Sequence, residues 1–110
     1  MGHWIFLALS IVTEVGGTTS MKLSDGFTKP VFTVFIFIFY GVSFYWFSLA
    51  VKQIDFSVAY AIWAGLGTAL IAVIGALYFR EGMDTIKIIS LAAIIAGVIG
   101  LNLAGGQGET

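Results

Sequence analysis

The chain has 110 residues, of which 59% are hydrophobic and only 10% are charged. A water-soluble domain of this size could not cover so much apolar surface with so few charges, so the composition predicts an integral membrane protein. A net charge of −1 argues against a nucleic-acid partner, and the absence of cysteine excludes disulfides and cysteine-based metal sites.

Four apolar segments predict an all-α membrane protein with transmembrane helices over residues 3–21, 31–51, 56–79 and 86–103. Each is long enough to cross a hydrocarbon core of about 30 Å. The connections are short and polar, so we expect a single four-helix domain over residues 1–110, with a flexible tail over residues 104–110. The loops are too short to hold a catalytic site, so we expect no enzyme, and any activity must take place in or across the bilayer.

The first segment carries Glu14 as a lone acid in an apolar stretch. A carboxylate in hydrocarbon costs on the order of 3 kcal/mol on insertion scales, which favours a proton- or cation-binding role in a cavity. The alternative is a protonated acid that only hydrogen-bonds between helices. The residues that share the face of Glu14 by helical period are Leu7, Ser10, Gly17, Thr18 and Met21, and this face is small and weakly polar around the acid.

Aromatic faces follow in the second and third segments. The second carries Tyr40, Ser43 and Phe44 at helical spacing, and the third carries Tyr60 and Trp63. Aromatic rings attract cations, and the attraction grows when the site is dry. Lipid contact or interfacial anchoring is the other reading for such rings.

The fourth segment has a row of small residues that we expect to serve dimerisation: Ser90, Ala93, Gly97 and Gly100. Many transporters bind their substrate between two pseudo-symmetric halves. No internal repeat is visible here, so a homodimer would supply the second half and bring two copies of Glu14 to a shared site. One histidine and one buried acid make no metal site, and we expect neither metal nor cofactor.

The basic residues are unevenly divided between the two sides of the membrane. Lys22, Lys29, Arg80 and Lys87 belong to the first and third connections, and Lys52 alone belongs to the other side. The positive-inside rule places the first and third connections in the cytoplasm. A fixed and a mixed orientation both stay open.

Several motifs together resemble the small multidrug resistance transporters, and within them the exporters of quaternary ammonium compounds. The motifs are Glu14-Val15-Gly16-Gly17-Thr18-Thr19, residues 21–27, residues 59–67, and Ala96-Gly97-Val98 with Asn102. The resemblance covers essentially the whole chain. It implies an antiparallel, dual-topology dimer in the inner (plasma) membrane that exchanges protons for hydrophobic cations, with proton and drug competing for Glu14.

The resemblance also implies a substrate pocket. By match, its lining would be Leu7, Ser10, Gly17, Thr18, Tyr40, Ser43, Phe44, Tyr60 and Trp63, together with Trp4. Trp4 stands where the family often has tyrosine, Ser10 where it often has alanine, and Asp55 where it often has proline. The charge bias leaves room for a heterodimer with a paired subunit.

The sequence is compatible with three functions. Gly17-Thr18 follows the glutamate where the guanidinium-exporting subtype usually has Trp-Ala, which favours export of lipophilic cations. A guanidinium exporter of the same family is the second reading. The third is a non-transporting membrane subunit in which Glu14 is structural.

Overall fold

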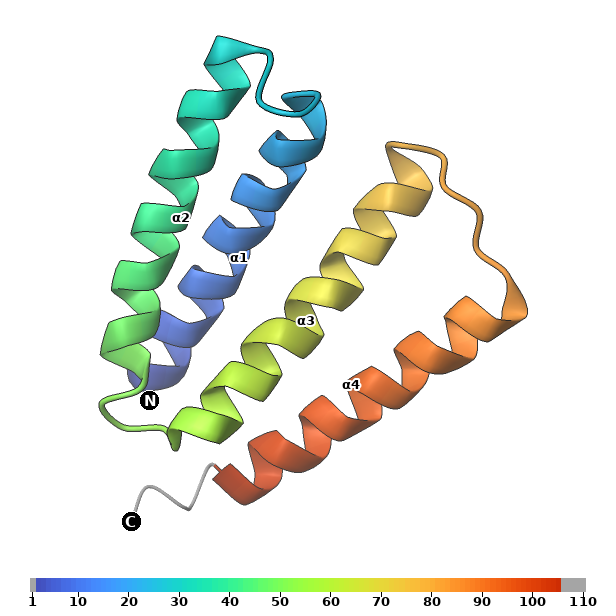
Figure 1. The fold of residues 1–110 in the computed structure, drawn as a ribbon. Helices are drawn as coiled ribbons and strands as arrows, with labels where there is room; N and C mark the ends of the chain where they lie inside the picture. The colour runs from blue at the N-terminus through green and yellow to red at the C-terminus, as the bar shows by residue number, and fades with distance from the viewer. Residues whose placement is uncertain (1, 106–110) are drawn as a thin grey trace. The chain divides into compact units, whose positions relative to one another are not determined.

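The computed structural model describes residues 2–105, which form four α-helices (Figure 1). They are α1 (Gly2–Leu23), α2 (Pro30–Ala50), α3 (Phe56–Leu77) and α4 (Thr85–Gly105). All four are long and apolar enough to span a membrane, which confirms the expected all-α membrane fold. Residues 104 and 105, which the composition assigns to a flexible tail, continue α4, and the rest of that tail lies outside the described residues.

The helices group into two compact units, Met1–Gln53 and Ile54–Thr110. The first unit contains α1 and α2, and the second contains α3 and α4. The single four-helix domain expected from the sequence stays a prediction.

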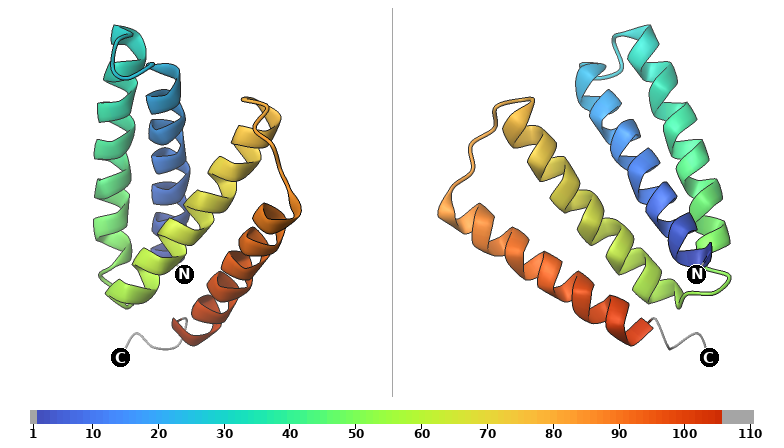
Figure 2. Two further views of the ribbon diagram at one scale, coloured as in Figure 1. Left: turned by 45° about the vertical axis from the view of Figure 1, so that its right-hand side comes forward. Right: turned by 180° about the vertical axis from the view of Figure 1, so that it is seen from behind.

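In the first unit α1 and α2 run antiparallel and side by side, as the views in Figures 1 and 2 agree. Leu7, Ile11 and Val15 recur every four residues on one face of α1 and are buried, as is Ile36 of α2. Gly16 brings the two helices close together, since a Cβ there would lie 3.2 Å from the Phe39 ring. The contact is therefore an apolar stripe with glycine at its closest approach.

The connection between α1 and α2 is a tight turn centred on Ser24. The Ser24 hydroxyl donates to the Met21 carbonyl (2.8 Å) and accepts from the Phe27 N–H (3.0 Å). Asp25, Gly26 and Phe27 all have left-handed φ angles, of 52°, 71° and 67°. Pro30 then opens α2, where its fixed φ and missing N–H suit the first turn of a helix.

In the second unit α3 packs against α4. Gly65 lies at the closest approach, because a Cβ on it would stand 2.7 Å from Val98 Cγ2 and 3.2 Å from Ile94 Cγ2. Val98 is the buried side chain of α4, whereas most of that helix is exposed within the chain. The α3–α4 contact therefore depends on one glycine and the branched residues that face it.

The end of α3 and the start of α4 have separate causes. Arg80 has a left-handed φ of 58° and turns the chain off the helix, so that the Glu81 N–H donates to the Gly75 carbonyl (2.9 Å). For this reason α3 ends at Leu77, two residues before the end expected from hydropathy. Asp84 then caps α4, since its Oδ1 accepts the Lys87 N–H (2.9 Å).

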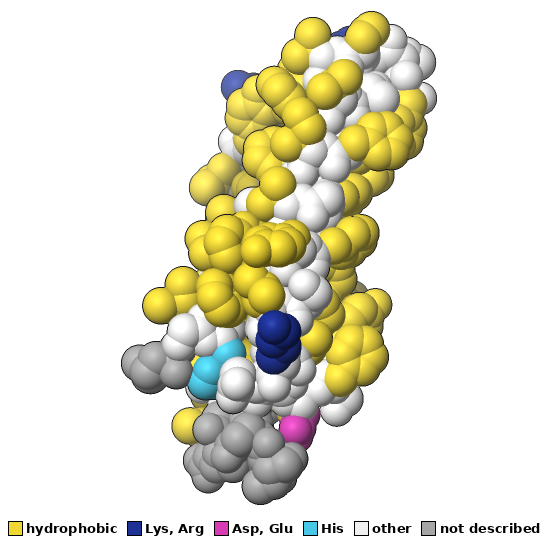
Figure 3. Space-filling view, turned by 90° about the vertical axis from the view of Figure 1, so that its left-hand side faces the viewer, with side chains coloured by type: hydrophobic (Ala, Val, Ile, Leu, Met, Phe, Trp, Pro, Cys, Tyr) yellow, Lys and Arg dark blue, Asp and Glu magenta, His cyan; other side chains and the backbone are white. Residues whose placement is uncertain are grey.

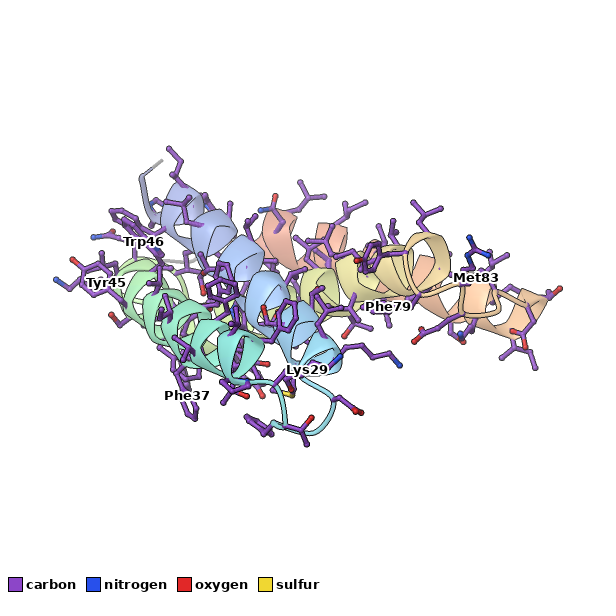
Figure 4. All side chains as sticks on the ribbon, turned by 90° about the horizontal axis from the view of Figure 1, so that it is seen from above. Lys29, Phe37, Tyr45, Trp46, Phe79 and Met83 are labelled. Carbon is purple, nitrogen blue, oxygen red and sulfur yellow. The ribbon has the colours of Figure 1, made fainter. Side chains whose placement is uncertain are left out.

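The outward faces of the helices are apolar. Hydrophobic side chains cover most of the face shown in Figure 3, and the Lys, Arg, Asp and Glu side chains visible there lie towards its two ends. On α2, Phe37 is 69% exposed and points away from α1 (Figure 4). This arrangement suits a chain whose surroundings are lipid rather than water.

We expect Gly65→Ala to lower the free energy of unfolding in detergent by about 1–3 kcal/mol, the usual cost of overpacking. The new methyl would press on Val98, whose branched side chain has little rotamer freedom. The measurement is loss of helicity during titration with a denaturing detergent.

Gly41→Ala is the matched control, because a Cβ at Gly41 meets nothing within 4 Å. Alanine favours a helix over glycine by up to about 1 kcal/mol, so this variant should be as stable as the native chain or more so. Equal stability of the two variants would contradict the role given to Gly65.

Candidate functional site

Glu14 is the only acidic residue within the four helices. The other acids of the described chain, Asp25, Asp55, Glu81 and Asp84, lie in the connections. Glu14 lies in the middle of α1 and is half-buried. Its carboxylate is thus kept away from both helix ends, where water would solvate a charge.

Two hydroxyls connect Glu14 to the neighbouring helix. Thr18, one turn further along α1, donates its Oγ1–H to Glu14 Oε2 (2.7 Å). The Tyr40 hydroxyl of α2 lies 2.6 Å from the same Thr18 oxygen. Both distances are those of good O–H···O hydrogen bonds. Three of the residues expected from the sequence therefore form one continuous polar chain across the α1–α2 contact.

Glycine allows Tyr40 to approach α1 this closely. A Cβ on Gly17 would stand 3.2 Å from the Cδ1 and Cε1 atoms of the Tyr40 ring. On its own helix the Tyr40 ring stacks on Phe44, with centroids 6.2 Å apart and planes at 13°. Phe44 is 58% exposed, so the aromatic face expected on α2 is continuous and partly open.

Ser10 and Ser43 form a clasp between α1 and α2. The Ser10 hydroxyl donates to the Ser43 carbonyl (2.9 Å), and the Ser43 hydroxyl donates to the Ser10 carbonyl (2.7 Å). Both serines are completely buried, and Leu7 is buried to 2% exposure one turn before Ser10. In this structure all three contribute to the contact between α1 and α2, and their part in lining a substrate pocket stays a prediction.

Trp4 lies in the first turns of α1, away from the Glu14 group. It is half-buried, and its ring centroid is 5.8 Å from that of His3. Trp46 of α2 stacks on Phe6 of α1 at 5.5 Å and 20°. The end of the first unit is thus a cluster of aromatic rings, which is typical of a membrane interface.

The second unit holds the other aromatic pair. The Tyr60 and Trp63 rings of α3 lie 5.7 Å apart at an angle of 34°. Tyr60 is 54% exposed and Trp63 is half-buried. The spacing of three residues therefore places two π faces next to each other, as expected from the sequence.

The small residues of α4 are not covered by α3. Ser90, Ala93, Gly97 and Gly100 are all exposed within the chain, and a Cβ on either glycine would meet nothing within 4 Å. The side chains that would meet a Cβ on Gly65 are Ile94 and Val98, which do not belong to this row. The row expected to serve dimerisation is thus open, and its role stays a prediction.

Two contacts between α1 and α2 are not predicted by the sequence. The helical period placed Thr18 and Tyr40 on their own helices, but it gave no register between α1 and α2, so their hydrogen bond could not be foreseen. The same holds for the pairing of Ser10 with Ser43. The sequence signal for these pairs is a serine one turn from the candidate site residue of each helix: Ser10 lies one turn from Glu14, and Ser43 lies one turn from Tyr40.

The chain is similar to several known membrane and resistance proteins. A family model described as Small Multidrug Resistance protein matches residues 2–94. The uncharacterized membrane protein YvaE of Bacillus subtilis (strain 168) is 52% identical over 101 residues, covering 92% of this chain and 85% of that protein. The quaternary ammonium compound-resistance protein QacF of Klebsiella aerogenes is 45% identical over 103 residues, covering 94% of each chain. Multidrug resistance protein EbrB of Bacillus licheniformis is 45% identical over 102 residues, covering 93% of this chain and 86% of that protein. These matches confirm the resemblance inferred from the motifs.

We expect Ser10→Ala and Ser43→Ala each to destabilise the chain by about 0.6–1.7 kcal/mol, the range for hydrogen bonds between membrane helices. Each change removes a bond that holds α1 to α2. Unfolding in detergent measures the loss, and binding of a lipophilic cation is measured on the same samples.

Ser48→Ala is the control, because the Ser48 hydroxyl bonds the Tyr45 carbonyl of its own helix (2.7 Å) and crosses to no other. Its stability should stay near that of the native chain. If Ser10→Ala and Ser43→Ala weakened cation binding and left stability intact, the two serines would be substrate contacts rather than a clasp.

Proposed function

Because this chain belongs to the Small Multidrug Resistance protein family, we propose that it exports hydrophobic and quaternary ammonium cations in exchange for protons. It is a multi-pass protein of the plasma membrane, and on this proposal a transporter rather than an enzyme. The names of QacF and EbrB support the substrate class, since they refer to resistance to quaternary ammonium compounds and to multiple drugs.

One observation supports the coupling mechanism. The single acid of the four helices, Glu14, lies at mid-helix and accepts a hydrogen bond from Thr18, which also bonds Tyr40. A carboxylate in an apolar setting is costly unless a proton or a cation neutralises it. Glu14 can bind either a proton or a cation, but not both at once. A bound proton removes the negative charge that attracts the cation. Proton and cation therefore compete for one site, and competition at a site that opens alternately to the two sides of the membrane gives exchange.

The aromatic residues supply the rest of the affinity. Tyr40 with Phe44 on α2, and Tyr60 with Trp63 on α3, offer π faces to a cation. Such faces demand no fixed hydrogen-bond geometry, so cations of different shapes can bind. This property suits a multidrug substrate range better than the small, planar guanidinium ion, which a fork of hydrogen-bond acceptors would recognise.

A homodimer of subunits in opposite orientations is the proposed functional unit. Two inverted copies supply the two halves that alternating access requires. The open row of Ser90, Ala93, Gly97 and Gly100 on α4 supports this part of the proposal, because small residues let membrane helices approach closely. A second copy of the chain would then bring a second Glu14 to the shared site.

Glu14→Gln should abolish uptake of a quaternary ammonium ion into proteoliposomes driven by a pH difference, while the chain still folds. The amide keeps an oxygen that can accept the Thr18 hydroxyl but cannot take up or release a proton near neutral pH. Uptake of guanidinium, measured in parallel on the native chain, tests the other transport reading.

Glu81→Gln is the matched control, since Glu81 lies in the connection between α3 and α4 and is exposed. This variant should transport normally. Continued proton-driven uptake by Glu14→Gln would overturn the mechanism, and failure of that variant to fold would favour a structural role for Glu14.

Trp63→Ala should weaken the binding of tetraphenylphosphonium by about 1–2 kcal/mol, the size of a cation–π contact away from water. Isothermal titration calorimetry measures the change. Trp46→Ala is the control, because Trp46 packs on Phe6 in the other unit and should affect stability more than binding. If the two variants lost affinity equally, Trp63 would have no special place in the pocket.

A further inference from the structure

When Glu14 is ionised, the hydrogen-bond chain at its carboxylate has a defined direction. A threonine hydroxyl carries one proton, and Thr18 donates that proton to Glu14 Oε2 (2.7 Å). The 2.6 Å contact between Thr18 Oγ1 and the Tyr40 hydroxyl can then be made only if Tyr40 is the donor. Both O–H groups thus point towards the carboxylate, from Tyr40 to Thr18 and from Thr18 to Glu14.

This direction matters because it favours one charge state. A hydrogen bond donated to a carboxylate is stronger than one donated to the neutral acid. The bond from Tyr40 polarises the Thr18 hydroxyl and strengthens the bond that Thr18 makes in turn. Tyr40 therefore acts on Glu14 without touching it, because its hydroxyl ends at Thr18.

Few other groups can act on Glu14 from the helices of its unit. α2, which packs against α1, carries Tyr40 and Tyr45 as its only titratable side chains and no charged one. Tyr45 is 59% exposed and lies at the outer side of α2 (Figure 4). On α1 itself, His3 and Lys22 lie about three and two turns away from Glu14.

We propose that Tyr40 is a positioning residue that acts through Thr18, and that this two-hydroxyl relay sets the pH range over which a cation replaces the proton on Glu14. The inference rests on the proposed exchange of protons for cations. It assigns different roles to the two hydroxyl residues. Thr18 stabilises the ionised carboxylate directly, and Tyr40 does so only while Thr18 carries its hydroxyl.

The test is the pH at which half of the bound tetraphenylphosphonium is lost on acidification, measured on the purified full chain. Thr18→Val removes the direct donor and keeps the shape, and should raise this midpoint by about one pH unit. Tyr40→Phe should raise it by about 0.3 unit, since it removes only the polarising bond. The double variant should match Thr18→Val, because Tyr40 has no other route to Glu14.

Two controls separate the relay from a general loss of packing. Thr18→Ser restores the hydroxyl and should return the midpoint to its native value. Thr13→Val and Tyr45→Phe remove hydroxyls from the same two helices, and Thr13 bonds only the Leu9 and Ser10 carbonyls of its own helix. These two variants should leave the midpoint unchanged.

A Tyr40→Phe shift that persists in full on the Thr18→Val background would overturn the relay, as would an unchanged midpoint in Thr18→Val. The proposed function fails in a different way. In that case binding by the native chain would not depend on pH, or Glu14→Gln would keep the native pH profile.

Discussion

A carboxylate inside an apolar helix must be given partners, and the first unit is arranged around that requirement. Glu14 has no lysine or arginine within hydrogen-bonding reach in its unit. Its partner is instead the neutral hydroxyl of Thr18, which in turn bonds the Tyr40 hydroxyl. Such an arrangement lowers the cost of the charge without cancelling it. A full ion pair would hold the carboxylate permanently occupied, whereas hydroxyl donors leave it able to take a proton or an organic cation.

Keeping these hydroxyls in place depends on how closely α1 and α2 approach. Gly16 and Gly17 leave room for Phe39 and for the Tyr40 ring, and the Ser10–Ser43 clasp holds the helices one turn away from Glu14. In lipid, helix association gains little from burying apolar surface, so close backbone approach and a few hydrogen bonds carry it. The small residues near the acid therefore serve packing and site geometry at once.

The contact between the two helices of the second unit is smaller. α3 and α4 meet at Gly65, where Val98 fills the space that a side chain would take, and most of α4 is exposed within the chain. A helix so little covered by its own chain presents an apolar surface to lipid or to another copy. The proposed dimer uses this property, since the small residues of α4 are exposed within the chain.

The membrane class, the four helices and the position of Glu14 as their single acid could all be predicted from the sequence, because hydropathy, segment length and a lone intramembrane acid are properties of single segments. It also placed Thr18 beside Glu14 and Tyr60 beside Trp63, since residues three or four apart share a helix face. The pairs that cross from α1 to α2, Thr18 with Tyr40 and Ser10 with Ser43, depend on how the two helices pack and could not be predicted from either segment alone. Helical periodicity orders residues around one axis and contains no register between two helices, which the contacts at Gly16 and Gly17 set instead. The early end of α3 likewise came from the left-handed turn at Arg80, which hydropathy does not record.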